Sequence, residues 1–288
     1  MRVGLLEDIA RPVGDASKPA LARLREAGGQ GYDAVWLQDA ASGGALSAQL
    51  LFVAAQLAAL EGSPALGLCS QPSGSLHPLR VAEELAVLDI MTAGRLEWAM
   101  APDAEGWEVL EIVLRAWRGE PFSHTGERHS IPEITCHPVP LREPHPAIWL
   151  ADDASIPKSV PLEGHGRIVG MSARLCELDA AAVPRAIVRQ VVLTDSRVEA
   201  RETAASAVEH RLGRALGVDE KITDFAIVGD AAACREQVER LRAEHSPDIL
   251  VVAEGSAADH PGARAEWQRA FAEDVLSGLS RPPEQGRP

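Results

Sequence analysis

Short apolar segments alternate with longer segments of mixed polarity along the first 118 residues. The apolar segments have the length of buried strands and lie at residues 1–6, 33–39, 64–70 and 95–101. The segments between them have helical character and begin near residues 17, 46, 78 and 105. This alternation predicts a parallel sheet whose strands are joined by crossover helices.

The second half of the chain contains the same kinds of element at less regular spacing. Four further strands are expected at residues 147–152, 167–171, 185–194 and 248–254, and helices at residues 198–216, 231–245 and 263–279. Residues 119–146 are rich in Pro, Gly and His and predict an extended excursion with a hairpin. Pro157 and Pro161 leave little room for a crossover helix between the first two of these strands.

Eight candidate strands with interspersed helices predict the α/β class. The simplest closure is a TIM (β/α)8 barrel with shortened late crossovers. We expect it to form one domain over residues 1–280, followed by a disordered tail at residues 281–288.

The predicted helix at residues 46–60 is apolar around nearly its whole circumference. A helix on the outside of a barrel that is apolar on so many faces must be covered by something else. A dimer interface would cover it. The alternative is that the excursion at residues 119–146 covers it within the monomer.

Composition narrows the possible partners and location. The formal net charge is -14, with 42 acidic against 28 basic residues, which argues against a general affinity for nucleic acid or anionic membranes. The four cysteines are widely spaced and no leader segment precedes them, so we expect reduced thiols in a cytoplasmic protein. The longest strongly apolar run, residues 50–60, is too short to span a bilayer.

The stretch HPLRVAEELAVLDIMTAGRLEWAMA, residues 77–101, resembles the luciferase-like flavin-dependent monooxygenases, a family that includes bacterial luciferase and coenzyme F420-dependent oxidoreductases. Three further stretches agree with that family in the same order: GYDAVWLQD, VLRAWRGEPFSHTGERHSIP and PHPAIWLADDAS. The resemblance implies a TIM barrel that binds flavin at the carboxyl ends of its strands and dimerises through early helices.

The resemblance also places candidate cofactor-binding residues at the strand ends. Cys69, Ser70, Ala101 and Asp152 are expected to line the flavin ring, and Asp153 falls where the family has a serine that contacts the phosphate. Cys69 is expected to be a small buried core residue rather than a nucleophile. No residue stands out as catalytic.

Several family residues are missing from this sequence. Ala40 and Ala41 replace a histidine pair that is frequent in the family, Ala101 replaces a reactive cysteine, and Pro102 replaces an arginine beside it. Proline has no amide proton and aspartate repels an anion, so the phosphate loses two of its donors. Lys158 or Arg174 could restore the positive charge from new positions, or both could be merely solvated.

A metal site is not expected. His124, His129, Cys136 and His137 could be drawn as zinc ligands, but family hairpins of the same kind carry similar residues without metal. His77 precedes Pro78 at a helix start, where capping or packing is a simpler role than catalysis. The sequence contains no GxSxG, P-loop or HExxH motif.

The function implied by the resemblance is that of a flavin-dependent oxidoreductase or monooxygenase. It would use reduced FMN and dioxygen on a small organic substrate, with a separate flavin reductase as a possible partner. The subunit would form a homodimer, or a heterodimer with a related subunit. Two alternatives stay open: a non-catalytic partner subunit or binding protein with a degenerate flavin site, and an F420-dependent oxidoreductase.

Overall fold

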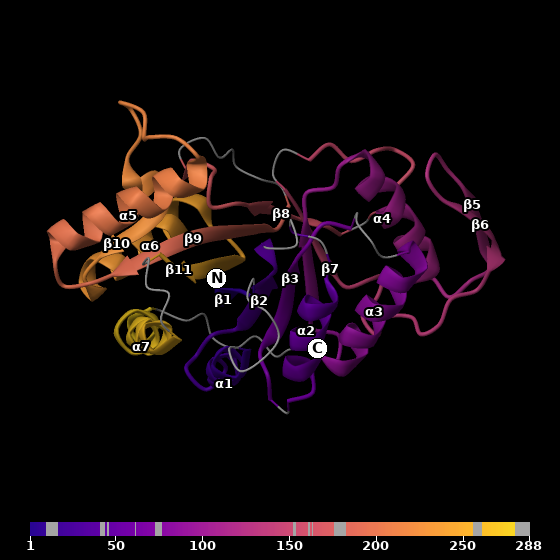
Figure 1. Ribbon diagram of the computed structural model, residues 1–288, viewed down its shortest axis with the longest axis horizontal. Coiled ribbons are helices and arrows are strands. Elements are labelled where there is room, and N and C mark those ends of the chain that lie inside the picture. The colour runs from indigo at the N-terminus through magenta and orange to yellow at the C-terminus, as the bar shows by residue number, and fades with distance from the viewer. Residues whose placement is uncertain are drawn as a thin grey trace. The chain divides into compact units, whose positions relative to one another are not determined.

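The computed structural model describes residues 1–9, 17–40, 44, 46–60, 62–72, 77–151, 154–160, 162, 164–175, 183–255 and 261–279. These residues form two compact units (Figure 1). The central unit contains Glu7–Arg25 and Ala34–Ile168, and the terminal unit contains Met1–Leu6, Glu26–Asp33 and Val169–Pro288. The tail expected at residues 281–288 lies outside the described residues.

The central unit is built on parallel strands that follow one another in sequence order. They are β2 (Ala34–Gln38), β3 (Ala65–Cys69), β4 (Leu96–Met100), β7 (Ala147–Ala151) and β8 (Gly166–Val169). The helices of this unit are α1 (Ser17–Glu26), α2 (Ala48–Ala58), α3 (Pro78–Met91) and α4 (Ala104–Ala116). Each corresponds to a predicted element, with ends shifted by a few residues.

Side chains of these strands alternate between two faces. One face is apolar and packs against α2, α3 and α4; Trp98 lies there and makes an edge contact with Trp117 at the end of α4. The opposite face, which we call the inner face, carries Trp36, Gly67, Cys69, Glu97 and Trp149 in matching register. Both Trp98 and Trp149 are buried and belong to the core.

The predicted excursion contains an antiparallel hairpin of β5 (Phe122–Thr125) and β6 (Ser130–Ile134). β5 packs against α4, beyond which the hairpin extends in Figure 1. A second anchor is Asp89 of α3, whose Oδ2 accepts the Leu141 and Arg142 amides at 2.8 and 2.9 Å. The described residues between β7 and β8 contain no helix, as the prediction of a shortened crossover requires.

The terminal unit has its own parallel strands in the order β10-β9-β11-β1. They are β1 (Arg2–Asp8), β9 (Arg185–Leu193), β10 (Ala226–Gly229) and β11 (Ile249–Glu254). α5 (Arg197–Leu212) and α6 (Ala231–His245) pack on β9 and β10, whereas α7 (Pro261–Ala270) packs on β11 and continues through short helical turns to Gly278.

Two predictions for this unit need correction. β10 was not expected, because its four residues give too short an apolar pattern; β10 pairs with the end of β9. α5 ends at Leu212 and not at residue 216, because Gly213 adopts the left-handed conformation with φ of 66°. None of the described helices is long and apolar enough to cross a membrane.

Candidate functional site

The carboxyl ends of β2, β3, β4 and β7 lie at one edge of the central unit because these strands are parallel and adjacent. The register places Gln38 beside Cys69 and Cys69 beside Ala99. Ala101, directly after β4, is exposed. The expected site residues Cys69, Ser70 and Ala101 are therefore neighbours along this edge, whereas Asp152 and Asp153 lie outside the described residues.

Cys69 has the character of a packing residue. Burial raises the pKa of its thiol to about 12, so the thiol stays protonated at neutral pH. A protonated thiol is a poor nucleophile, which agrees with the expectation from the sequence. Burial also raises the pKa of Cys136 and Cys234, and all three described cysteines are free. The expected fourth thiol, Cys176, lies outside the described residues.

Ser70 and Gln71, which follow β3, are held in place by hydrogen bonds. The Ser70 amide donates to the Ala99 carbonyl at 3.0 Å, and the Ser70 hydroxyl accepts the indole N–H of Trp98 at 3.0 Å. The Gln71 amide donates to the Gly44 carbonyl at 2.6 Å. The side-chain Oε1 of Gln71 is buried and has no hydrogen-bond partner among the residues that the structure describes. A buried acceptor of this kind fits a ligand N–H donor, such as the imide of a flavin ring.

The start of α4 does not fit a phosphate group. Asp103 is the N-cap of α4, and its Oδ1 accepts the Gly106 amide at 2.8 Å. Its carboxylate therefore takes the helix N-terminus that a bound anion would otherwise use. Pro102 offers no amide proton. After β4 the chain therefore places its own carboxylate where a bound phosphate would need an N–H donor.

The other strand-end carboxylates also have structural partners. Glu7 forms a buried ion pair with Arg23, with Oε1 and NH2 separated by 2.5 Å. Asp8 accepts the Gln38 side-chain amide at 3.2 Å, and Asp39 accepts the Ser47 hydroxyl at the start of α2 at 2.6 Å. The structure shows carboxylates that hold the loops of this edge in place.

Arg167 is a positive charge at this edge that the sequence interpretation missed. Its NH1 donates to the Ala151 and Ala154 carbonyls at 3.0 and 2.7 Å, which places the guanidinium beside the end of β7. Of the two residues proposed from the sequence, Lys158 is exposed, and Arg174 lies 3.8 Å from Asp224 in the terminal unit. Arg167 escaped notice because it stands inside the strand GRIV and not after it.

Glu97 is a second residue that the sequence interpretation missed. It is buried on the inner face, and its Oε2 accepts the Trp149 indole N–H at 2.8 Å. The available signal was an acidic residue between buried apolar neighbours in LEWAM. This hydrogen bond fixes the Trp149 ring beneath the strand ends, because Trp149 pairs with Ala99.

Two histidines of the excursion, His124 and His129, contact the carboxylate of Glu108 on α4. Glu108 Oε1 lies 3.2 Å from His124 Nε2 and accepts the His129 amide at 2.8 Å. Within the described ranges, no group of three or more His, Cys, Asp or Glu side chains could hold a metal ion. His77 caps α3, and its Nδ1 accepts the Leu79 amide at 3.3 Å, as expected.

Comparison with family models finds no match to the chain. The oxygenase component of flavin-dependent trigonelline monooxygenase from Acinetobacter baylyi is 31% identical over 94 residues. That match covers 26% of this chain and 26% of the relative, so the chain spans about a quarter of the length of that relative.

Solved structures match almost the whole chain. Monooxygenase RslO1 from Streptomyces bottropensis superposes with a TM-score of 0.72 at 19% identity, over 97% of this chain and 100% of that one. The oxygenating constituent of 3,6-diketocamphane monooxygenase from Pseudomonas putida, in complex with FMN, gives 0.66 at 15% identity over 98% and 99%. An F420-dependent secondary alcohol dehydrogenase gives 0.70 at 15% identity over 97% and 99%.

These matches at low identity cover both units and establish the fold. The expected barrel fold, built from the eight predicted strands, is confirmed. The chain therefore has the TIM (β/α)8 barrel fold of these solved structures, which are flavin-dependent monooxygenases and an F420-dependent dehydrogenase.

Proposed function

We propose that this chain is a flavin-dependent oxidoreductase, in the simplest case the oxygenase component of a monooxygenase that acts on a small organic substrate. The observation that carries the proposal is the superposition of nearly the whole chain on oxygenating enzymes, one of them in complex with FMN. The relative from Acinetobacter baylyi supports it independently at the level of sequence.

The edge of the central unit supports a ring-binding role for the end of β3. Cys69 and Ser70 would lie against the flavin ring, and Gln71 Oε1 would accept a ring N–H in place of the protein donor it lacks. Ala101, Asp152 and Asp153 remain expected neighbours of the cofactor. When bound, reduced flavin would supply the activation of dioxygen, a chemistry that no protein side chain provides.

Arg167 supports the binding of the cofactor phosphate. Two of its hydrogen bonds hold the guanidinium beside the end of β7. A guanidinium offers five N–H donors, so donors remain for an anion after both carbonyls are satisfied. We therefore assign to Arg167 the positive charge that Pro102 and Asp103 cannot supply.

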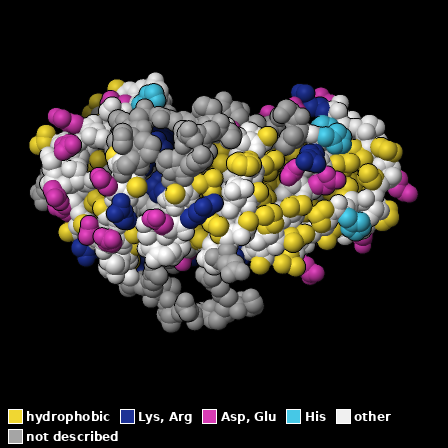
Figure 2. Space-filling view, turned by 60° about the horizontal axis from the view of Figure 1, so that its bottom comes forward, with side chains coloured by type: hydrophobic (Ala, Val, Ile, Leu, Met, Phe, Trp, Pro, Cys, Tyr) yellow, Lys and Arg dark blue, Asp and Glu magenta, His cyan; other side chains and the backbone are white. Residues whose placement is uncertain are grey.

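Two partners follow from this proposal. The relative from Acinetobacter baylyi is named as an oxygenase component, which implies a separate reductase for that protein and supports one here. A second subunit, identical or related, would cover the apolar face of α2 and α3, where Phe52, Val87, Ile90 and Met91 are 38 to 49% exposed. Figure 2 shows hydrophobic side chains gathered over this part of the molecule.

The cofactor assignment can be tested by titrating the purified chain anaerobically with reduced FMN and with reduced F420. We expect saturable binding of FMN that is weakened about tenfold or more in Arg167→Gln, whereas Arg118→Gln, which removes an exposed arginine of the same unit, binds as the wild type does. If F420 binds more tightly than FMN, the cofactor of this site is F420. Equal binding in Arg167→Gln would remove the role of Arg167.

A further inference from the structure

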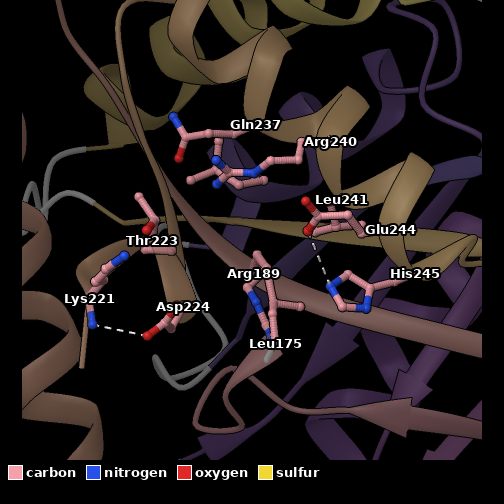
Figure 3. Close-up of a pocket in the computed structure, with 12 residues that line it drawn as sticks. Leu175, Arg189, Lys221, Thr223, Asp224, Gln237, Arg240, Leu241, Glu244 and His245 are labelled. Carbon is pink, nitrogen blue, oxygen red and sulfur yellow. Dashed lines mark hydrogen bonds and ion pairs between the residues drawn. The ribbon is translucent and has the colours of Figure 1, made fainter. Parts of the chain in front are cut away.

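The terminal unit contains a cavity of about 280 Å³ that is separate from the strand edge described above (Figure 3). It lies between the middle of β9, the start of β10 and the last turns of α6. The charged and titratable side chains in its wall are Arg189, Lys221, Asp224, Arg240, Glu244 and His245. The remaining lining is small, apolar or neutral, so charge dominates the recognition properties of this cavity.

Arg189 is the buried cation of the cavity. Its side chain is fully buried, and NH1 and NH2 donate to the backbone carbonyls of Val188, Gly170 and Ala173 at 2.6, 3.0 and 3.0 Å. Its Nε is buried and has no hydrogen-bond partner. Among the described residues, no carboxylate lies within ion-pair distance of Arg189.

A buried guanidinium without an ion-pair partner is an unfavourable arrangement. Desolvation lowers the pKa of Arg189 to about 10, a value at which the group still carries its charge at neutral pH. The charge therefore persists in the folded protein. A bound anion would remove both the unpaired charge and the unused Nε donor.

The charge of Asp224 raises the pKa of Arg189 from beyond contact distance, but neither Asp224 nor Glu244 forms an ion pair with Arg189. Asp224 Oδ2 accepts the Lys221 amide at 3.0 Å and lies 3.8 Å from Arg174. Glu244 has a side chain that is 58% exposed and lies 3.9 Å from His245. Figure 3 shows Arg189 between Asp224 on one side and His245 on the other.

Two exposed cations add to the positive character of the opening. Lys221 precedes the short helical turn before β10, and Arg240 lies on α6. Burial lowers the pKa of His245; the charge of Glu244 opposes this and those of Arg185 and Arg189 add to it, so the ring is neutral at neutral pH. The three cations of the wall, Arg189 included, thus face two carboxylates, of which Asp224 has partners of its own and Glu244 is largely exposed to solvent.

We propose that this cavity binds a small oxyanion, a carboxylate or phosphate group, that accepts a hydrogen bond from Arg189 Nε and is flanked by Lys221 and Arg240. The volume sets the upper size of the ligand, because cavities of 300 Å³ and more are typical for drug-sized ligands. The occupant is therefore a metabolite of few heavy atoms or the anionic group of one. The site is distinct from the flavin edge and does not depend on the proposed function.

Calorimetric titration of the full chain with inorganic phosphate and with succinate tests this proposal, with sodium chloride of equal ionic strength as the reference. We expect saturable binding of at least one of the two anions. The double variant Lys221→Gln/Arg240→Gln should bind it about tenfold more weakly. Both residues are exposed, so their replacement should leave folding intact.

Two controls separate this site from other effects of charge. Arg118→Gln/Arg201→Gln removes the same net charge at exposed positions outside the cavity and should bind as the wild type does. Arg167→Gln should also leave binding unchanged, because its charge belongs to the flavin edge. The proposal is overturned if neither anion binds saturably, or if the charge-matched control or Arg167→Gln weakens binding as much as the double variant. Binding of inorganic phosphate would indicate that the cavity recognises phosphate groups, and binding of succinate would indicate that it recognises carboxylates.

Discussion

Gly67 of β3 leaves the space that the Trp36 ring occupies on the inner face. A Cβ atom at this position would lie 2.1 Å from Trp36 Cδ2, far inside van der Waals contact. Trp36 is fully buried and cannot move away freely. The glycine is therefore required by packing between adjacent strands, and not by backbone conformation.

Replacing Gly67 by Ala should lower the free energy of unfolding by about 1–3 kcal/mol, because the ring or the strand must shift. Chemical denaturation followed by tryptophan fluorescence measures the change. Gly170→Ala is a matched control, since nothing lies within 4 Å of its added Cβ. Equal stability of the two variants would contradict the packing role of Gly67.

Asp103 combines a structural role with an electrostatic cost. Asp103→Ala removes the N-cap of α4 and should destabilise the protein by about 0.5–2 kcal/mol. Asp103→Asn keeps a capping oxygen but removes the negative charge, so it should retain stability and bind FMN more tightly than the wild type. Thermal unfolding and flavin titration of both variants measure the two effects. Weaker FMN binding by Asp103→Asn would show that the carboxylate does not oppose the phosphate.

At the scale of elements, the β5–β6 hairpin is held to α4 by Glu108. Gly126 leaves room for this contact, since a Cβ there would lie 2.2 Å from Glu108 Oε1 and would displace the carboxylate. Burial raises the pKa of Glu108, but hydrogen bonds from the His129 and Arg128 amides and from His124 outweigh it and lower the pKa below the ordinary value of 4.5. The ionised carboxylate is therefore the form that stabilises the hairpin.

Because the pKa of Glu108 is lowered in the folded protein, the stability that Glu108 contributes depends on pH. A carboxyl group whose pKa is lower in the folded state stabilises the protein above its unfolded pKa and loses that contribution as the pH falls through the folded pKa. Glu108→Gln should thus be less stable than the wild type at neutral pH, with a difference that shrinks below about pH 4.5. Denaturation of both proteins across this range measures it. A difference that stays constant with pH would contradict the role of the charge.

A substitution on the apolar face of α2 and α3 can test the proposed subunit contact. The excursion, expected as one possible cover for the first of these helices, packs instead on α3 and α4. Ile90→Glu should therefore shift the mass measured by light scattering from dimer to monomer. Val198→Glu, at a residue 70% exposed on α5, is the matched control and should leave the mass unchanged. An unchanged mass in Ile90→Glu would place the interface elsewhere.

At the scale of the whole molecule, the sequence predicted the eight strands because each is an apolar run of strand length between helical segments. It missed β10, whose four residues give too short an apolar pattern, and the hydrogen bonds of Asp8, Asp39 and Asp103, which come from loop geometry. It also missed Arg167, because a long side chain inside a strand can reach beyond its end. The fold could thus be derived from pattern, whereas the partners of charged groups required coordinates.

The central claim is that the strand edge of the central unit binds reduced flavin. This binding can be measured by titrating the wild-type chain anaerobically with reduced FMN and determining the bound fraction by equilibrium dialysis. We expect saturable binding of one FMN per chain with a dissociation constant in the micromolar range. The absence of saturable binding of reduced FMN would contradict it, and would favour a binding protein that has kept the barrel without its cofactor.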